Sequence, residues 1–252
     1  MKVLIGCEFS GIVREAFRKR GHEAYSCDIL PSSDNSKYHI QDDVLNILND
    51  NWDLAIFHPP CTYLCSSGIH WNDRGRGWDE TNKALEFVNK LLNAPIEKIA
   101  LENPVGIISS RIRKPDQIIQ PWQFGHDASK ATCLWLKNLS KLQHAKIIAP
   151  KKWKLIKFAS DMPINPDTEE AFCEECDMDF AECECFGPTQ DDVEYKEFKG
   201  YLFGTMQKPI PKMIWGNQTP SGQNKLGPSE DRWMERSLTY QGIADEMVKQ
   251  WG

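Results

Sequence analysis

Short apolar runs alternate with amphipathic segments along the first hundred residues. The apolar runs are four or five residues long and are followed by glycine or polar residues, which predicts buried β-strands at 2–6, 24–27, 54–57 and 98–101. Apolar residues recur at helical spacing in the segments 12–20 and 81–92. This alternation of strands and helices predicts an α/β fold with a parallel sheet and helices on its faces.

The pattern is less regular after the fourth apolar run. Residues 132–136 have a strand-like composition, and apolar residues along one side of 243–251 predict a final helix. Residues 65–79 are rich in Gly, Trp, His and Arg, so we expect a mobile active-site loop with little regular structure.

Charge divides the chain further. The net charge of the 252 residues is −6, but segment 161–197 alone holds 14 acidic residues and one basic residue. The rest of the chain then carries 22 acidic and 29 basic residues, a net charge of +7, which is compatible with a polyanionic partner. We predict a catalytic domain at 1–145 plus 236–252, and a small target-recognition-like region at 146–235 that carries the acidic insert.

The nine cysteines are expected to be thiols or metal ligands. No apolar run approaches the ~20 residues that span a bilayer, and no signal peptide is evident, so we expect a cytoplasmic protein without disulfides. Four cysteines lie within thirteen residues of the acidic insert: Cys173, Cys176, Cys183 and Cys185. They predict a tetrahedral structural zinc site, with free thiols as the alternative.

A proline-stiffened turn follows the third predicted strand. Pro59 and Pro60 fix their own φ angles, and Pro60 also restricts the residue before it, so Cys61 receives a defined backbone position. The end of a buried strand is where an α/β enzyme places a nucleophile. The alternative is an inert cysteine that fills a small apolar space beside a turn.

Other strand ends carry candidate polar residues. Asp28 closes the second predicted strand, where such sheets bind ribose hydroxyls, although it can also simply cap a turn. Glu102 follows the run 98–101 and would lie beside the cleft of a parallel sheet, unless it is a helix N-cap. We expect Pro104 to stop the pairing of that strand.

In this order the motifs resemble those of the DNA cytosine C5-methyltransferase family. That family has a Phe-x-Gly loop, an acid that ends the second strand, a Pro-Pro-Cys nucleophile and a Glu-Asn-Val motif. The matching positions are Phe9-Ser10-Gly11, Asp28, Pro59-Pro60-Cys61 and Glu102-Asn103-Pro104. The resemblance covers residues 1 to about 140 and the last fifteen or so. It implies a Rossmann-like methyltransferase sheet and DNA as the partner.

The resemblance also implies S-adenosylmethionine as cofactor. Asp43-Val44 is similar to the family's Asp-Ile that meets the adenine, and the segment from Gly242 resembles its last motif, which returns to the cofactor pocket. Val13 departs from the family, since it stands where a second glycine is expected. The cofactor-binding positions are then Phe9, Ser10, Gly11, Asp28, Asp43, Val44, Pro59 and Gly242.

Catalytic roles follow from the same resemblance. A Cys61 thiolate would add to cytosine C6, Glu102 would protonate or hydrogen-bond N3, and Asn103 would hold the loop. The base must be flipped out or single-stranded to reach such a site. The substrate-binding residues expected are Pro60, Arg74, Arg76 and Lys130, with Lys130 in place of the cation of the family's Gln-x-Arg-x-Arg motif.

Two other functional classes stay open. An amino-methyltransferase acting on adenine N6 or cytosine N4 places an aromatic residue directly after Pro-Pro and needs no cysteine, whereas here Tyr63 comes two positions after Cys61. The other is an inactive, zinc-bearing nucleic-acid-binding protein on a methyltransferase scaffold. The prediction is cytosine C5 methylation in DNA by a compact, monomeric enzyme of phage-like type, working in the bacterial host cytoplasm.

Overall fold

The computed structural model describes residues 1–147, 152–157, 210–219, 224–227, 229 and 232–252. The chain forms two compact units, the first made of Met1–His126, Lys130–Ile147 and Pro228–Gly252 and the second of Asp127–Ser129 and Ile148–Gly227. The second unit contains an antiparallel pair of strands, β8 (Lys152–Lys157) and β9 (Ile210–Ile214). Cys173, Cys176, Cys183 and Cys185 lie outside the described residues.

The first unit is built on a seven-stranded sheet with the order β3-β2-β1-β4-β5-β7-β6. The strands are β1 (Lys2–Gly6), β2 (Glu23–Asp28), β3 (His39–Gln41), β4 (Leu54–Phe57), β5 (Lys98–Pro104), β6 (Gln117–Ile119) and β7 (Thr132–Lys137). Strands β1 to β5 are parallel, and β7 runs antiparallel to both of its neighbours. This order is that of a doubly wound, Rossmann-like sheet, so the predicted α/β fold class is confirmed, while the predicted cysteine-rich insert lies outside the described residues.

The pairing of β5 ends at Pro104, as expected, but the strand extends three residues beyond its predicted end at Leu101. The parallel partner β4 does end beside Leu101, but β7 runs along the other side of β5 and continues past that point. Asn103 therefore pairs with Cys133, and Pro104 pairs with Thr132. Glu102 is the first residue of β5 beyond the end of β4, which leaves it at the carboxyl edge of the parallel strands.

Three longer helices were predicted from the sequence, and all three are present: α1 (Ile12–Lys19), α3 (Asp79–Leu92) and α6 (Gln241–Trp251). Shorter helical segments are α2 (Ser66–Ile69), α4 (Ile108–Arg111), α5 (Arg232–Ser237) and the 3-10 turns η1 (Val44–Ile47), η2 (Asn72–Arg74) and η3 (Pro121–Gln123). None of the described helices is both long and apolar enough to cross a membrane.

The expectation of an irregular loop at 65–79 is wrong, because α2 and η2 lie within it. Arg76 ties the two together: its Nη2 donates to the carbonyl of Gly68 at 2.8 Å and to Oδ1 of Asn72 at 2.7 Å. These hydrogen bonds join residues four and eight positions apart. They do not depend on apolar residues, so the short helices leave no apolar periodicity in the sequence and could not be predicted from it.

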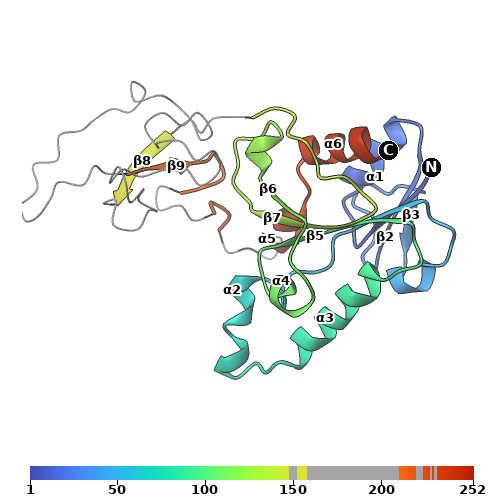
Figure 1. The fold of residues 1–252 in the computed structure, drawn as a ribbon, viewed down its shortest axis with the longest axis horizontal. Helices are drawn as coiled ribbons and strands as arrows, with labels where there is room; N and C mark the ends of the chain where they lie inside the picture. Colours follow the sequence, from blue (N-terminus) through green and yellow to red (C-terminus); the bar gives the residue numbers. More distant parts are fainter. Residues whose placement is uncertain (148–151, 158–209, 220–223, 228, 230–231) are drawn as a thin grey trace, which may run out of the picture. The chain divides into compact units, whose positions relative to one another are not determined.

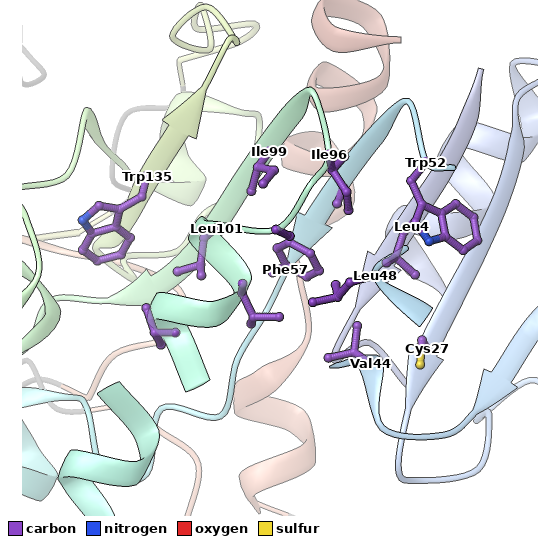
Figure 2. Close-up of a cluster of buried hydrophobic side chains, with 14 of the residues drawn as sticks. Leu4, Cys27, Val44, Leu48, Trp52, Phe57, Ile96, Ile99, Leu101 and Trp135 are labelled. Atoms are coloured by element: carbon purple, nitrogen blue, oxygen red, sulfur yellow. The ribbon is translucent and has the colours of Figure 1, made fainter. Parts of the chain in front are cut away.

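Successive residues of the central strands enter two different cores, one on each face of the sheet. On β1, Leu4 packs into one core while Val3 and Ile5 pack into the other. Helix α3 covers the first core, which Figure 2 shows around Phe57, and α1 and α6 cover the second (Figure 1). Because both faces are buried, these strands are continuously apolar rather than alternating.

The chain reverses its direction of winding between β1 and β4. From β1 it proceeds outward to β2 and β3, and it then returns to the other side of β1 as β4. The loops after β1 and β4 therefore diverge at the carboxyl edge, and a crevice at such a switch point is where open α/β sheets bind ligands. Both the glycine loop and the Pro-Pro-Cys turn begin there.

Replacement of Gly6 by alanine tests the packing beneath this crevice. A Cβ on Gly6 would lie 2.5 Å from Cδ1 of Phe57 and 2.8 Å from Cγ2 of Val44, and both side chains are buried. Gly6→Ala should lower the free energy of unfolding by about 1–3 kcal/mol in urea denaturation. The control is Gly227→Ala, where an added Cβ meets nothing within 4 Å; equal stability of the two variants would contradict this account.

Candidate active site

The Pro-Pro turn fixes Cys61 at the carboxyl end of β4. The backbone N–H of His58 donates to the carbonyl of Gly6 at 2.9 Å, which keeps the start of the turn against β1. The carbonyl of Cys61 accepts from the N–H of Cys65 at 2.9 Å, so the chain folds back immediately after the cysteine. Cys61 is half-buried and Pro60, predicted to meet the substrate, is exposed beside it.

Asn103 supports the same turn from the neighbouring strand. Its Nδ2 donates to the carbonyl of Pro59 at 2.7 Å, and the side chain is only 2% exposed. Its Oδ1 is buried without a hydrogen-bond partner among the described residues. The structure therefore places Asn103 where the resemblance implies it, against the backbone that carries Cys61.

Glu102 and His58 form a buried pair. His58 Nδ1 and Glu102 Oε2 are 2.7 Å apart, and the side chains are 10% and 12% exposed. Burial alone would raise the pKa of Glu102, but the hydrogen bond and charge of His58, with Lys130 and a hydrogen bond from Thr239, hold that pKa below its ordinary value. Burial alone would lower the pKa of His58, but Glu102 and Glu8 raise it. Each partner therefore favours the charged form of the other, an imidazolium beside a carboxylate.

Lys130, expected from the sequence to bind the substrate, acts on this pair through its charge. Its Nζ donates to the carbonyls of Arg236 at 2.9 Å and Leu238 at 3.4 Å, at the end of α5 and just beyond it. Its positive charge helps to lower the pKa of both Cys61 and Glu102. Lys130 is thus a cation held by backbone carbonyls near the proposed nucleophile and acid.

The thiol of Cys61 is protonated at rest. A hydrogen bond with Cys65 and burial raise its pKa well above the ordinary range, and the positive charges of Lys130 and Arg236 only partly oppose them. The thiolate is the nucleophilic form of cysteine, so the reaction has to remove this proton before Cys61 can add to a substrate.

The glycine loop after β1 closes onto helix α1. Glu8 is buried, and its carboxylate accepts from the backbone N–H groups of Val13 at 2.7 Å and Arg14 at 3.3 Å, which satisfies the start of the helix. Gly11 has a φ of +72°, and a side chain there would collide with the Arg14 guanidinium. The loop that holds Phe9 and Ser10 therefore needs glycine at position 11.

Acidic residues gather on the other side of this loop. Burial contributes most to the raised pKa of Cys7, and the negative charges of Asp28 and Asp43 raise it further. Both carboxylates therefore lie near the start of the loop. Asp28 ends β2 half-buried, and burial raises its pKa, as suits an acceptor of ribose hydroxyls. Ile29 follows it with 73% of its surface exposed. Carboxylates beside an exposed apolar side chain fit a nucleoside such as that of S-adenosylmethionine.

Val44 and Gly242, both predicted to contact the cofactor, have packing roles. Val44 is 4% exposed and lies beneath Gly6. The backbone N–H of Gly242 donates to Nε2 of His126 at 2.9 Å, and a side chain on Gly242 would collide with the carbonyl of Phe124. Glycine at this position lets α6 approach the segment around η3.

Arg74 is the last residue of η2, and Arg76 lies just after it. The guanidinium of Arg76 is used within its own segment and also lies 4.8 Å from the Tyr63 ring centroid. Arg74 is exposed, 5.9 Å from the centroid of the exposed Trp71 ring. Arg74 therefore remains accessible for a phosphate contact, while Arg76 mainly shapes the segment.

The buried Arg14 was not anticipated from the sequence. Its guanidinium donates to Ser26 Oγ at 2.8 Å and pairs with Asp34, so it ties the loop after β2 to helix α1. The signal available was an arginine between the apolar positions Val13 and Phe17 of the helix. Such a residue is usually an exposed neighbour of the apolar face, and only the fold shows that it is inside.

Glu8, His58 and Thr239 were also missed. Glu8 and His58 each lie within two residues of the end of a predicted strand, which is the position that drew attention to Asp28 and Glu102. Thr239 lies just before the predicted last helix and carries no comparable signal. Among the described residues, no group of three or more His, Cys, Asp or Glu could hold a metal ion.

No family model matches the sequence, and no curated protein matches it. A solved structure with a related backbone is that of a candidate DNA modification methyltransferase encoded within an E. coli prophage. The two chains are 14% identical over 62% of this chain, with a TM-score of 0.39. The match spans about 60% of that protein's length. No function carries over at this level of similarity.

Removal of the Asn103 side chain should loosen the nucleophile turn. Asn103→Ala leaves the buried carbonyl of Pro59 without its donor, and we expect a loss of about 1–3 kcal/mol in the free energy of unfolding. Asn93→Ala is the matched control, because its Nδ2 makes the same kind of bond to the carbonyl of Asn89 at 2.8 Å on the surface. Similar losses in the free energy of unfolding of both variants would show that the buried hydrogen bond stabilises the protein no more than the exposed one.

Removal of the Cys65 thiol should make Cys61 more reactive. Cys65→Ala deletes the hydrogen bond that contributes most to the raised pKa of Cys61, so the thiolate fraction rises. Alkylation of Cys61 by iodoacetamide at pH 8, followed by peptide mass mapping, should become several-fold faster. Ser66→Ala, one residue away, should leave the rate unchanged, and a slower rate in Cys65→Ala would contradict the assignment.

Proposed function

We propose that this chain transfers a methyl group from S-adenosylmethionine to C5 of cytosine in DNA. The observation that carries the proposal is that Cys61 and Glu102 lie beyond the ends of the neighbouring parallel strands β4 and β5, and that the charge of Lys130 acts on both. Phe57 and Leu101 are register partners; Glu102 directly follows Leu101, and Cys61 lies four residues after Phe57, on the Pro-Pro turn. A nucleophile and a proton carrier at the same edge of the sheet are what addition to a pyrimidine ring requires.

The cofactor would lie over the ends of β1 and β2. Asp28 and Asp43 would accept its hydroxyl and amino donors, and Ile29 would contact a ring face. S-adenosylmethionine supplies an electrophilic methyl group when it is bound. The residues of the chain have the remaining task, which is to make C5 of cytosine nucleophilic.

That task begins at Cys61. Its thiolate forms a bond to C6, and the electron pair of the C5–C6 double bond moves into the ring as Glu102 supplies a proton to N3. The enriched C5 then accepts the methyl group. A water molecule takes the C5 proton, the electron pair of that C–H bond restores the C5–C6 double bond, and the C6–S bond breaks to release Cys61 as a thiolate. The target base must be extruded from a duplex or be single-stranded to reach these groups.

Lys130 supports this chemistry electrostatically. Its charge favours the thiolate of Cys61 over the thiol, and it is held in place by carbonyls rather than by a carboxylate that would neutralise it. The geometry gives less support to an amino-methyltransferase. The aromatic residue nearest Pro-Pro is Tyr63, whose ring lies beneath the Arg76 guanidinium.

Trapping on 5-fluorocytosine tests the reaction. The protein would be mixed with S-adenosylmethionine and with single- or double-stranded DNA containing 5-fluorocytosine. Fluorine cannot leave C5 as a proton, so the enzyme should stall with Cys61 bonded to C6. We expect a denaturation-resistant adduct by intact mass, which peptide mapping assigns to Cys61 and not to Cys65.

Cys61→Ser should abolish the adduct while S-adenosylmethionine binding, measured by calorimetry, persists. An amino-methyltransferase would instead form no adduct, and its methylation of unmodified DNA would persist in Cys61→Ser. An inactive scaffold need not bind the cofactor. No adduct with either form of DNA, despite cofactor binding, would overturn the proposal.

A further inference from the structure

A second carboxylate faces His58 besides that of Glu102. Glu8 is 5% exposed, and its negative charge acts on His58 just as the charge of His58 acts on Glu8. Glu8 follows β1 and His58 follows β4. These two strands are adjacent, and their last residues, Gly6 and Phe57, are register partners. His58 is therefore bonded to a carboxylate from β5 and acted on by the charge of a second carboxylate that follows β1.

The surrounding hydrogen bonds fix the roles of these groups. Glu8 accepts from two backbone N–H groups of α1, which hold its position. Burial raises the pKa of Glu8, and the charge of His58 and these two hydrogen bonds only partly oppose that rise. His58 Nδ1 is bonded to Glu102, and its Nε2 is buried without a hydrogen-bond partner among the described residues. The imidazole thus has one direction in which to pass a proton, toward Glu102.

We propose that His58 is a positioning residue that stores the proton which Glu102 delivers to cytosine N3, with Glu8 stabilising the charged imidazole. The inference rests on the proposed function and names a residue outside its Cys-Glu pair. As the Cys61–C6 bond forms, the proton on His58 Nδ1 passes to the Glu102 carboxylate, and Glu102 passes it on to the ring nitrogen N3. One proton has then moved, which leaves a neutral imidazole and a carboxylate. The proton returns along the same path when Cys61 is expelled.

The arrangement solves a specific problem. A glutamate whose carboxylate is paired with a cation is unprotonated near neutral pH, so it has no proton of its own to give. The groups that face His58 are Glu102, Glu8 and Lys130, of which the two carboxylates favour the imidazolium and the lysine opposes it. The pair should therefore keep one transferable proton up to the raised pKa of His58 and lose it above that pH.

Histidine NMR tests the stored proton without any substrate. The ring nitrogens of His58 should titrate above the ordinary value of ~6.5. Glu102→Gln, which keeps the size of the side chain, should move the midpoint to lower pH, and Glu8→Gln should move it in the same direction. His58→Gln identifies the resonance among the six histidines, and His144→Asn is the surface control. A midpoint at or below ~6.5 in the unaltered protein would overturn the inference.

The pH profile of adduct formation tests the use of the proton. The rate of 5-fluorocytosine trapping should fall at alkaline pH in the unaltered protein. In His58→Gln, which can hydrogen-bond but cannot carry the proton, that fall should move to lower pH, and the rate at pH 8 should drop by about tenfold or more. Half-saturation by DNA should not change. A purely structural role would reduce the rate equally at every pH.

The two measurements separate the two proposals. If the adduct forms on Cys61 but the fall of the trapping rate at alkaline pH does not move in His58→Gln, the role of His58 is overturned and the proposed function stands. No adduct in the unaltered protein overturns both, even where the NMR midpoint is raised. Circular dichroism shows whether His58→Gln folds. If it does not fold, the pH profile of trapping is measured on Glu8→Gln instead, and its alkaline fall should move to lower pH by a smaller amount.

Discussion

The close approach of β1 and β4 is the constraint on which the site depends. Gly6 has no side chain, so the ring of Phe57 and the side chain of Val44 fill the space beside it. That contact sets the register in which both strands end at the same level. The glycine loop and the Pro-Pro turn then begin side by side, and beyond the last pair of the ladder the charge of Glu8 acts on His58.

Buried charge makes this edge of the sheet costly unless each group has a partner. Glu8 is held by the N-terminus of α1, Glu102 by His58, and Arg14 by Asp34 and Ser26. Removal of one member of such a set leaves another charge buried and unpaired, which usually costs more than the pair contributes. The same pairings fix the side chains that would meet a substrate, so stability and preorganisation come from one set of contacts.

The sequence predicted the parts of the structure that have a local cause. Apolar runs and helical spacing located the central strands and the three longer helices, whereas β3 and β6 are three residues long and too short for periodicity to reveal. Strand ends drew attention to Cys61 and Glu102. Links across the chain could not be predicted in the same way, because His58 bonds Glu102 44 residues away and Lys130 bonds Arg236 106 residues away.

The proposed chemistry places opposite demands on two protons in a small volume. Cys61 has to lose its proton before it can add to a ring, while Glu102 has to have one ready to give. A single environment cannot meet both demands, since positive charge favours the thiolate and also removes the proton from a carboxyl group. The fold divides the tasks between two strand ends. Arg236 acts on Cys61 and Lys130 acts on both groups, while the proposed proton store, His58, is bonded to Glu102 at 2.7 Å.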